Sequence, residues 1–457
     1  MIKSIHLEEI PYCPDSCLLF ERIRDLPEPA MLDSSFPHST SGRFDILTAN
    51  PLTPAPQPPP DGSSSASVQS WFTELEHFHR THFADTRGVS EELPFCGGLL
   101  GYIGYDLGNG LHDIDRSLAA SPFPHTHIAA YDWCIVQDHL LRRSVLVLLP
   151  RVSESVRTDL RSRLRHFPRP AAADFSLHGE FSANFTADDY RKTFAQVQAY
   201  IEAGDCYQVN LAQCFSARYA GDPWQAYRQL RGVAAAPFSA YLEPAPNRAL
   251  INLSPERFLT LQGRRVETSP IKGTRPRYDD PTVDALAAQE LRGSEKDRAE
   301  NLMIVDLLRN DLGRSCVPGS IHVERLFEIE SFPTVHHLVS TISGELATTS
   351  TPWQLLRNCF PGGSITGAPK RRSMQIIAEL EPRNRSAYCG SVMYVSADGR
   401  MDSNIAIRSL ICDGENVHCW GGGGLVADSQ WQLEYQETLD KVGRFMSLLE
   451  SLSGARD

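Results

Sequence analysis

The sequence predicts an α+β fold with antiparallel sheets. Short apolar runs rich in aromatic and β-branched residues recur along the chain, and several are separated by turns of hairpin length. Helical patterns occur between them, without the regular strand–helix alternation that builds a parallel sheet. With 457 residues, of which 41% are hydrophobic and 22% are charged, the chain has the composition of a globular protein with a sizeable core.

Both kinds of element can be placed along the chain. Apolar runs at 96–105 and 127–149 predict strands. Residues 187–203 predict a helix closed by Gly204, and residues 206–219 alternate in the manner of a strand. Further strands are expected at 239–243, 248–253, 257–261, 390–396 and 404–412.

Two segments interrupt the pattern of predicted helices and strands. Residues 51–67 are rich in proline and then serine, a composition too polar and too kinked to pack, so we expect a mobile loop there. The segment 168–181 is the second break, and we expect a boundary between two regions at this point. The N-terminal region would cover residues 1–167, and the second region residues 185–447.

Charge and cysteine content exclude several classes of function. A formal net charge of −12 argues against nonspecific binding to nucleic acid or anionic lipid. The most apolar run, 144–150, is too short to span a bilayer, and the first residues lack the apolar core of a signal peptide. Eleven cysteines without a C-x-x-C pair fit reduced thiols better than disulfides or a zinc site. We therefore expect a cytoplasmic protein with neither a nucleic-acid nor a membrane partner.

One predicted helix carries acids on its apolar face. The helix should begin after Ser294, which with Asp297 matches a capping box, and Gly313 is a plausible stop. On a helical wheel, Asp297 and Glu300 share a face with Ile304, Leu307 and Leu308. A carboxylate that faces a core needs a metal, a basic side chain or a set of donors, and the helix itself leaves this choice open.

A second acidic pair occurs near the C-terminus. Glu434 and Glu437 are three residues apart, and Lys441 follows four after Glu437. In isolation this is an ordinary exposed ion pair that contributes about 0.2–0.5 kcal/mol to helix stability. The two acid pairs could instead converge on one hard cation, for which an oxygen-rich site suits Mg²⁺.

Four further segments could carry chemistry. SPIKGTRPR, residues 269–277, places Lys272 on a turn stiffened by prolines, which by itself predicts a solvated lysine. Glycines in 361–374 precede a helix start and could present amides to an anion, and the glycine run 421–425 allows close backbone approach. Arg408 lies in a strand-like run, where it serves either a structural ion pair or a bound anion.

Taken together, these motifs are similar to those of the chorismate-utilizing enzymes. Their order and spacing match over roughly residues 185–447, and the N-terminal region, with MLDS at 31–34, resembles that of anthranilate synthase large subunits. The resemblance implies a large antiparallel β-sandwich core with helices packed outside, as in anthranilate synthase component I. The matching motifs are SPERF (254–258), PIKGTRPR (270–277), DRAENLMIVDLLRNDLGR (297–314), VHHLVS (335–340), PGGSITGAPK (361–370), YCGS (388–391), IAIRSL (405–410) and EYQETLDK (434–441).

Lys272 and Gln208 point to one branch of this family. Anthranilate synthase large subunits usually carry alanine at the position of Lys272, whereas PIKGT is typical of the branch that aminates chorismate at C4. Gln208 lies where isochorismate and salicylate synthases have a water-activating lysine. The resemblance therefore implies conversion of chorismate and ammonia to 4-amino-4-deoxychorismate, for p-aminobenzoate and folate synthesis.

The resemblance also implies roles for individual residues. Lys272 would be a covalent nucleophile, Glu256 the general acid, and His337 a proton handler or ring contact. A nucleophilic lysine must be neutral, and we expect burial to lower its pKa. Mg²⁺ would be held by Glu300 and Glu437 with support from Glu434 and Asp297, and the substrate would be contacted by Thr274, Thr366, Tyr388, Arg408, Gly422, Gly423 and Lys441.

The resemblance implies partners as well. Ammonia would come from a separate glutamine amidotransferase subunit, because no glutaminase nucleophile motif is evident in the chain. A tryptophan pocket is expected in the N-terminal part at Leu32, Ser34, Pro237, Phe238 and Ser239. Two alternatives stay open: an anthranilate synthase large subunit in which Lys272 is a bystander, and a non-catalytic regulator that binds chorismate or tryptophan.

Overall fold

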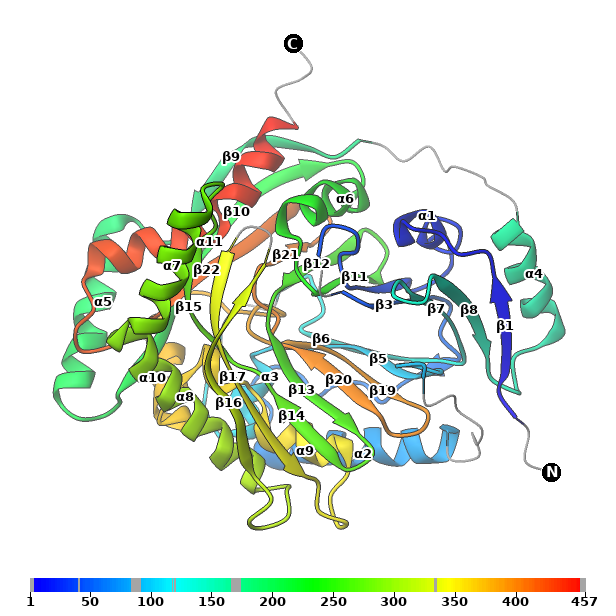
Figure 1. The fold of residues 1–457 in the computed structure, drawn as a ribbon, viewed down its shortest axis with the longest axis horizontal. Coiled ribbons are helices and arrows are strands. Elements are labelled where there is room, and N and C mark those ends of the chain that lie inside the picture. Colours follow the sequence, from blue (N-terminus) through cyan, green and yellow to red (C-terminus); the bar gives the residue numbers. More distant parts are fainter. Residues whose placement is uncertain are drawn as a thin grey trace.

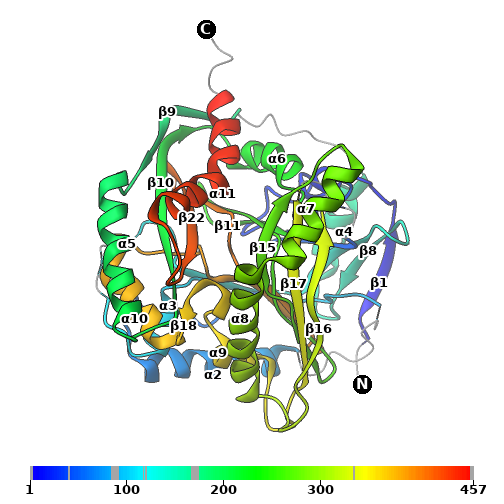
Figure 2. The same cartoon turned by 60° about the vertical axis from the view of Figure 1, so that its left-hand side comes forward.

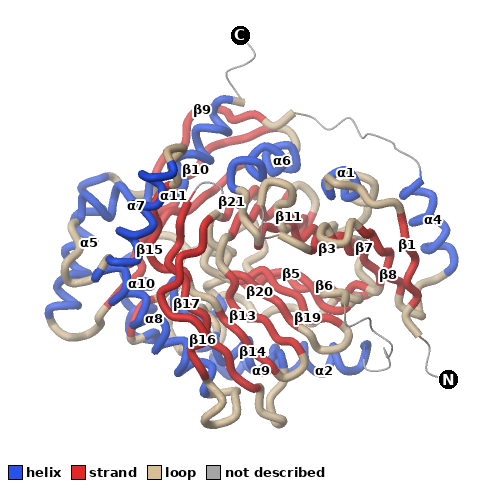
Figure 3. The backbone as a smooth tube through the Cα atoms, viewed as in Figure 1, coloured by secondary structure: helices blue, strands red, loops and turns tan. Residues whose placement is uncertain are grey.

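The computed structural model describes the chain except residues 1–3, 40–41, 84–91, 117, 119–120, 166–173, 333–334 and 453–457. Two large sheets form its centre, and every strand pairing within them is antiparallel. Helices cover the outside of the sheets (Figure 3). The predicted α+β sandwich is therefore confirmed.

The first sheet has twelve strands and contains the N-terminal strand (Figure 1). Its long strand β10 is the predicted strand at 206–219, shifted by one or two residues. In spatial order the strands are β1 (His6–Ile10), β8 (Arg143–Leu148), β7 (Trp133–Asp138), β3 (Phe44–Thr48), β2 (Ala30–Asp33), β11 (Phe238–Ala245), β12 (Arg248–Ser254), β21 (Ser409–Cys412), β22 (Asn416–Leu425), β10 (Gln208–Ala220) and β18 (Gly367–Ala368), with β9 (Ser176–Ala183) beside β10.

The second sheet has ten strands and carries the PIKGT segment on its edge strand β15. Its strand β17 is central to this edge, because β15, β14 and β16 all pair with it. In order the strands are β15 (Ile271–Pro276), β17 (Val335–Glu345), β14 (Arg265–Thr268), β13 (Arg257–Gln262), β20 (Met401–Asn404), β19 (Ser391–Ser396), β5 (Gly98–Ile103), β6 (Thr126–Tyr131) and β4 (Thr53–Pro54), with β16 (His322–Ser331) beside β17.

Helix α8 (Glu295–Gly313) is the predicted acidic helix, and it packs against β15 and β17 (Figure 2). Ser294 caps it by accepting from the Asp297 amide, as expected, but the Asp297 carboxylate turns to Arg275 and so does not complete the capping box. The other helices are α1 (Ser16–Phe20), α2 (Ser65–Phe83), α3 (Leu107–Leu111), α4 (Glu154–Arg165), α5 (Ala187–Glu202), α6 (Pro223–Ala234), α7 (Pro281–Gly293), α9 (Pro352–Cys359), α10 (Lys370–Leu380) and α11 (Trp431–Ser451), with a 3₁₀ turn at Gly363–Ile365.

The two regions expected from the sequence share both sheets. Strands from residues 1–167 and from residues 185–447 are neighbours in each sheet, as in the pairing of β2 with β11 and of β5 with β19. One hydrophobic core includes buried side chains of both regions. The predicted boundary falls on 168–181, part of which lies outside the described residues, so the division into regions stays a prediction.

Two local expectations need correction. The segment 51–67 contains the short strand β4 and ends in a helix, because the Ser64 hydroxyl accepts from the Ser67 amide and α2 begins at Ser65. The predicted strand 404–412 is broken at residues 405–408, where the chain leaves β20 in one sheet and enters β21 in the other. In the described part of the chain, no helix is both long and apolar enough to cross a membrane.

Candidate active site

The PIKGT segment buries its lysine instead of exposing it. Gly273 has φ +82°, and an added Cβ would lie 2.9 Å from Asp297 Cγ, so only glycine fits this turn. The turn directs Lys272 inward, where its side chain is 11% exposed and Nζ lies 3.1 Å from Glu300 Oε1. Lys272 Nζ also donates to the Ser364 carbonyl at 3.0 Å. The solvated surface lysine that the segment alone predicts is therefore wrong.

The pKa of Lys272 is raised, whereas the sequence-based expectation was a lowered pKa. Burial acts to lower its pKa, but the carboxylates of Glu300 and Glu256 act in the opposite direction, and the net shift is upward. The predicted lowering is therefore wrong for the protein as it stands, because it considered desolvation alone. Two acids brought close by other elements stabilise the ammonium form.

Glu256 lies on the short link between β12 and β13, where the chain passes from one sheet to the other. Its side chain is 4% exposed, and burial raises its pKa to about 7, although the Ser364 hydroxyl and the Ile271 amide both donate to the carboxylate. A carboxyl group with this pKa is protonated in about half of the molecules at neutral pH. It is suited to general acid catalysis.

Arg408 lies on another crossover between the sheets, the link from β20 to β21, with φ +54°. The two crossovers are joined, because the Ile405 amide donates to the Glu256 carbonyl and the Leu253 amide to the Arg408 carbonyl. Burial lowers the pKa of the Arg408 guanidinium, and among the residues that the structure describes no acid forms an ion pair with it. A buried cation without a counter-charge is costly, so this arrangement favours an anionic ligand.

His337 lies near Arg408 and stays uncharged. Its side chain is 3% exposed, and burial, with a smaller contribution from Arg408, lowers its pKa to about 3. Thr274 Oγ1 lies 2.8 Å from His337 Nδ1. A histidine with this pKa is neutral near pH 7 and is both a poor acid and a weak base, so of its two expected roles ring contact is favoured.

Tyr388 and the glycine run are in contact. The Tyr388 ring stacks on Trp420, with centroids 5.8 Å apart and an interplanar angle of 9°. A Cβ added at Gly422 would lie 2.9 Å from the Tyr388 hydroxyl oxygen, so glycine is required there. Lys441 Nζ donates to the Gly422 carbonyl at 2.7 Å.

The four predicted metal ligands each have a basic partner in the structure. Glu300 pairs with Lys272, and Glu437 pairs with Lys441 at 2.6 Å. Glu434 accepts from the Ser429 hydroxyl and lies 3.8 Å from Lys296, and Asp297 lies 3.3 Å from Arg275. In the described ranges, no three acidic, histidine or cysteine side chains lie close enough together to hold a metal ion.

The donor set nevertheless fits a hard cation. A Cβ added at Gly423 would lie 3.2 Å from Glu434 Oε2 and 3.6 Å from Glu437 Oε1, and one at Gly424 would lie 2.8 Å from Glu300 Oε1. Carboxylates of α8 and α11 therefore lie next to consecutive residues of β22, which face opposite sides of the strand. Burial, together with the charge of Glu437, raises the pKa of Glu434, which is the electrostatic strain that a divalent cation would relieve.

Backbone carbonyl groups in and just before the glycine-rich loop that precedes α10 accept hydrogen bonds from two basic side chains. Lys370 Nζ donates to the Cys359 carbonyl at 2.8 Å and pairs with Asp311 at 2.6 Å. Arg385 donates to the Ile365 carbonyl at 3.0 Å. The Thr366 hydroxyl bonds within the loop, at 3.2 Å from the Gly362 carbonyl, so its predicted contact with substrate stays a prediction.

Ser364, which contacts both Lys272 and Glu256, was not among the predicted site residues. The residue lies inside a quoted motif, but its contacts join three segments that are far apart in the chain. No spacing rule could identify them. The buried pair of Arg385 and Glu381 was also missed, since isolated charges in a loop normally indicate solvent exposure.

A cavity of about 380 Å³ lies between the sheets, beside these residues. All five residues of the predicted tryptophan pocket line it: Leu32, Ser34, Pro237, Phe238 and Ser239. Ser269 and Ile271 line it too, so one wall belongs to the strand that carries Lys272. The binding of tryptophan itself stays a prediction.

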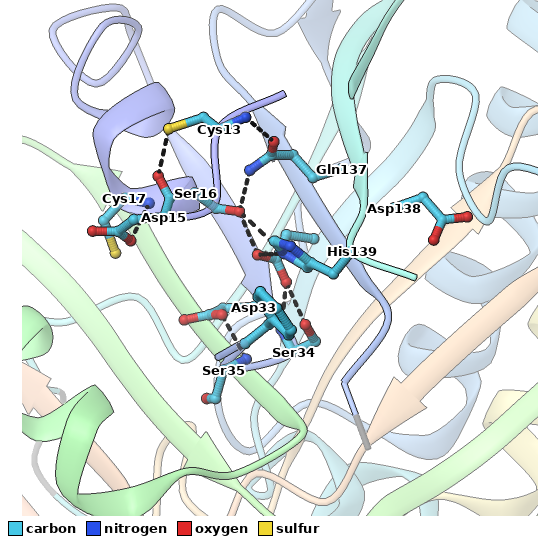
Figure 4. A network of polar contacts seen from close by, with 12 residues as sticks. Cys13, Asp15, Ser16, Cys17, Asp33, Ser34, Ser35, Gln137, Asp138 and His139 are labelled. Atoms are coloured by element: carbon cyan, nitrogen blue, oxygen red, sulfur yellow. Dashed lines mark hydrogen bonds and ion pairs between the residues drawn. The ribbon is translucent and has the colours of Figure 1, made fainter. Parts of the chain in front are cut away.

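A buried polar network fixes Ser34 at the cavity wall (Figure 4). The Ser34 amide and hydroxyl donate to Asp45 Oδ1 at 2.7 and 2.6 Å, and His139 Nε2 lies 2.7 Å from Asp45 Oδ2. Burial acts to raise the pKa of Asp45, but the bonds from His139, Ser16 and Ser34 hold it below its usual value. The network therefore keeps a negative charge under the cavity wall.

Comparison with known proteins places the chain in a family. The model of the chorismate binding enzymes matches residues 54–447. The chain belongs to the chorismate binding enzymes. It is 44% identical over 456 residues to aminodeoxychorismate synthase component 1 of Klebsiella aerogenes, covering 97% of this chain and 98% of that protein.

Two further relatives support this placement. Aminodeoxychorismate synthase component 1 of Escherichia coli (strain K12) is 44% identical over 437 residues, covering 94% of this chain and 95% of that protein. The crystal structure of anthranilate synthase component I from Streptococcus pneumoniae TIGR4 aligns with a TM-score of 0.76 at 30% identity, covering 89% of this chain and 93% of that one. The expected family, fold and branch are confirmed, and the site residues stay predictions.

Proposed function

We propose that this chain aminates chorismate at C4, forming 4-amino-4-deoxychorismate for p-aminobenzoate and folate synthesis. The observation that carries the proposal is the burial of Lys272 beside Glu256 and Glu300. In an enzyme that adds ammonia directly at C2, no step of the reaction would need a lysine nucleophile at this position. The names of the aminodeoxychorismate synthase relatives support the same branch.

The reaction consists of two successive displacements. Neutral Lys272 Nζ forms a bond to C2, the ring double bonds shift, and the C4 hydroxyl leaves as water with the proton of Glu256. Ammonia then bonds to C4, the double bonds shift back, and the C2–lysine bond breaks. Because Glu300 and Glu256 favour the ammonium form, Lys272 must lose a proton before it attacks.

Substrate binding follows from the charges of the site. Chorismate has two carboxylates, and Arg408, whose guanidinium has no acidic partner in the described chain, would hold the enolpyruvyl carboxylate with Tyr388. Thr274 and the uncharged His337 would contact the ring. Mg²⁺, held by Glu300 and Glu437 with Glu434 and Asp297 in support, would neutralise and fix the ring carboxylate.

A partner and a location belong to the same proposal. The relatives are named as component 1 of their enzyme, which supports a second subunit, and we infer that it is a glutamine amidotransferase supplying ammonia. The eleven cysteines form no disulfide in the described structure, which supports a reducing cytoplasm. Tryptophan is the ligand proposed for the cavity at Ser34.

The identity of the product tests the proposed function. The purified chain would be incubated with chorismate, MgCl₂ and an ammonium salt at alkaline pH, and the products resolved by chromatography. Aminodeoxychorismate is expected, and Lys272→Ala should abolish it. Anthranilate, formed equally well by Lys272→Ala, would assign the chain to the alternative branch, and no magnesium-dependent turnover at all would indicate a binding protein.

A further inference from the structure

One residue of the glycine-rich loop contacts both groups that the proposed reaction uses. The Ser364 hydroxyl donates to the Glu256 carboxylate, and the Ser364 carbonyl accepts from Lys272 Nζ at 3.0 Å. Within the described chain, no direct ion pair joins Glu256 to Lys272. Ser364 is buried, so solvent does not compete for either bond. It is the bridge between the acid and the nucleophile.

The loop around Ser364 has little freedom to move. A Cβ added at Gly363 would lie 2.7 Å from Leu307 Cδ2, and one at Gly362 would lie 2.4 Å from Ile405 Cδ1. Both glycines are therefore packed directly against neighbouring side chains. This close packing holds the loop between α8 and the sheet crossover.

Hydrogen bonds fix both ends of the loop. Lys370 holds the Cys359 carbonyl on one side of Ser364. On the other side, Arg385 holds the Ile365 carbonyl, and the Asn210 amide donates to the Thr366 carbonyl at 2.9 Å. The backbone position of Ser364 is thus set by three other elements.

We propose that Ser364 is a positioning residue that keeps the acid Glu256 and the nucleophile Lys272 in fixed relation to each other. Its hydroxyl orients the carboxyl group, and its carbonyl orients the amine. This role rests on the proposed function, because it needs Glu256 to deliver a proton while Lys272 attacks.

The hydrogen bond from Ser364 to Glu256 affects the pKa of Glu256, and this pKa can be measured. The other groups that act most strongly on the Glu256 carboxyl group are the Ile271 amide and the charges of Lys272 and Lys441. All of them favour the carboxylate and are unchanged when only the Ser364 hydroxyl is removed. Loss of this one donor should therefore raise the pKa of Glu256 further.

The test is the pH dependence of kcat/KM for Ser364→Ala and Ser364→Thr. Free ammonia would be held constant at every pH. For Ser364→Ala we expect the alkaline limb to move upward by about one pH unit, and kcat to fall by at least about tenfold, because the Glu256 carboxyl group loses its orientation while the carbonyl bond to Lys272 stays. Ser364→Thr keeps a hydroxyl and should restore the wild-type limb and most of kcat.

Ser144→Ala is the matched control, because it removes a buried hydroxyl that donates to Gln137 Oε1 at 2.6 Å, far from this loop in the sequence. It should lower the melting temperature and leave the pH profile unchanged. If Ser364→Ala keeps the alkaline limb and the kcat of the wild type, the proposal is wrong. Equal impairment of folded Ser364→Ala and Ser364→Thr would overturn it too.

A further variant and the activity of the wild-type chain separate a folding defect, and a failure of the proposed function, from a failure of the proposal about Ser364. Should Ser364→Ala fail to fold, Ser364→Cys, which retains a weak donor, should give an intermediate shift of the limb, and an unshifted limb would overturn the proposal. If the wild-type chain itself makes no aminodeoxychorismate, the proposed function fails, and the inference about Ser364 fails with it for that separate reason.

Discussion

Arg408 and Arg385 show how differently two arginines can be used in one protein. Arg385 is completely buried but fully paired, since it bonds to both Glu381 oxygens and to two carbonyl groups. Arg408 has no acidic partner in the described chain. A protein keeps such an unpaired cation when a ligand supplies the counter-charge.

We therefore predict opposite effects of removing these two charges. Arg408→Gln should lower kcat/KM for chorismate by roughly 10²-fold, because the substrate carboxylate loses a charged hydrogen bond, without lowering the melting temperature. Arg385→Gln should lower stability by about 3–5 kcal/mol, because it leaves Glu381 buried and unpaired. Steady-state kinetics and thermal melts measure both effects. A less stable Arg408→Gln with unchanged kinetics would show that Arg408 is structural.

Glu256 gives a pH-dependence prediction with a definite sign. Its pKa in the folded chain, about 7, lies above the ordinary glutamate value of 4.5, so the folded state binds this proton more tightly than the unfolded state does. The resulting stabilisation is fully present below about pH 4.5 and is lost as the pH rises through about 7. Between these values wild type should lose up to about 3 kcal/mol more unfolding free energy than Glu256→Gln. Urea unfolding at pH 5 and pH 8 would show this, and equal losses would contradict it.

At the level of elements, the site is built where segments leave one sheet for the other. Glu256 and Arg408 lie on two such links, which hydrogen-bond to each other, and Lys272 comes from the neighbouring edge strand β15. Short links with fixed ends restrict the side chains they carry. The sandwich therefore supports the site from both sides.

The turn in β15 can be tested with a matched pair of glycines. Gly273→Ala adds a Cβ at positive φ that meets Asp297, whereas Gly263→Ala adds one at φ +60° with nothing within 4 Å. Both should lose about 1 kcal/mol of stability from backbone strain, with a further loss in Gly273→Ala. Only Gly273→Ala should lower kcat, by at least about tenfold, because Lys272 is displaced. Denaturant melts and turnover measure this, and full activity in Gly273→Ala would contradict it.

At the scale of the whole molecule, the family motifs predicted the sandwich, and apolar or alternating runs located about half of the strands that the structure describes. The sequence placed helix α8 within one residue. The broken strand at Arg408 was not predictable, because the apolar pattern of 404–412 continues across a change of sheet. The raised pKa of Lys272 was missed for a related reason, since it depends on acids contributed by distant segments.

The cavity between the sheets predicts a stabilising ligand. Tryptophan at 100 times its dissociation constant should raise the unfolding free energy by about 2.7 kcal/mol, seen as a higher melting temperature in wild type. Ser34→Ala removes a donor to Asp45 at the wall and should reduce this shift relative to its own melting temperature without tryptophan. Phenylalanine is the control ligand. Equal small shifts with both amino acids would contradict a tryptophan site.

The nucleophilic role of Lys272 can be measured most directly by mass spectrometry. The chain would be mixed with chorismate and MgCl₂ without ammonia, quenched within one turnover, digested and analysed. We expect the peptide with Lys272 to gain the mass of chorismate less one water, and ammonia to discharge this adduct into aminodeoxychorismate. Rapid formation of aminodeoxychorismate by Lys272→Ala, with no adduct on wild type, would show that ammonia attacks without a lysine intermediate.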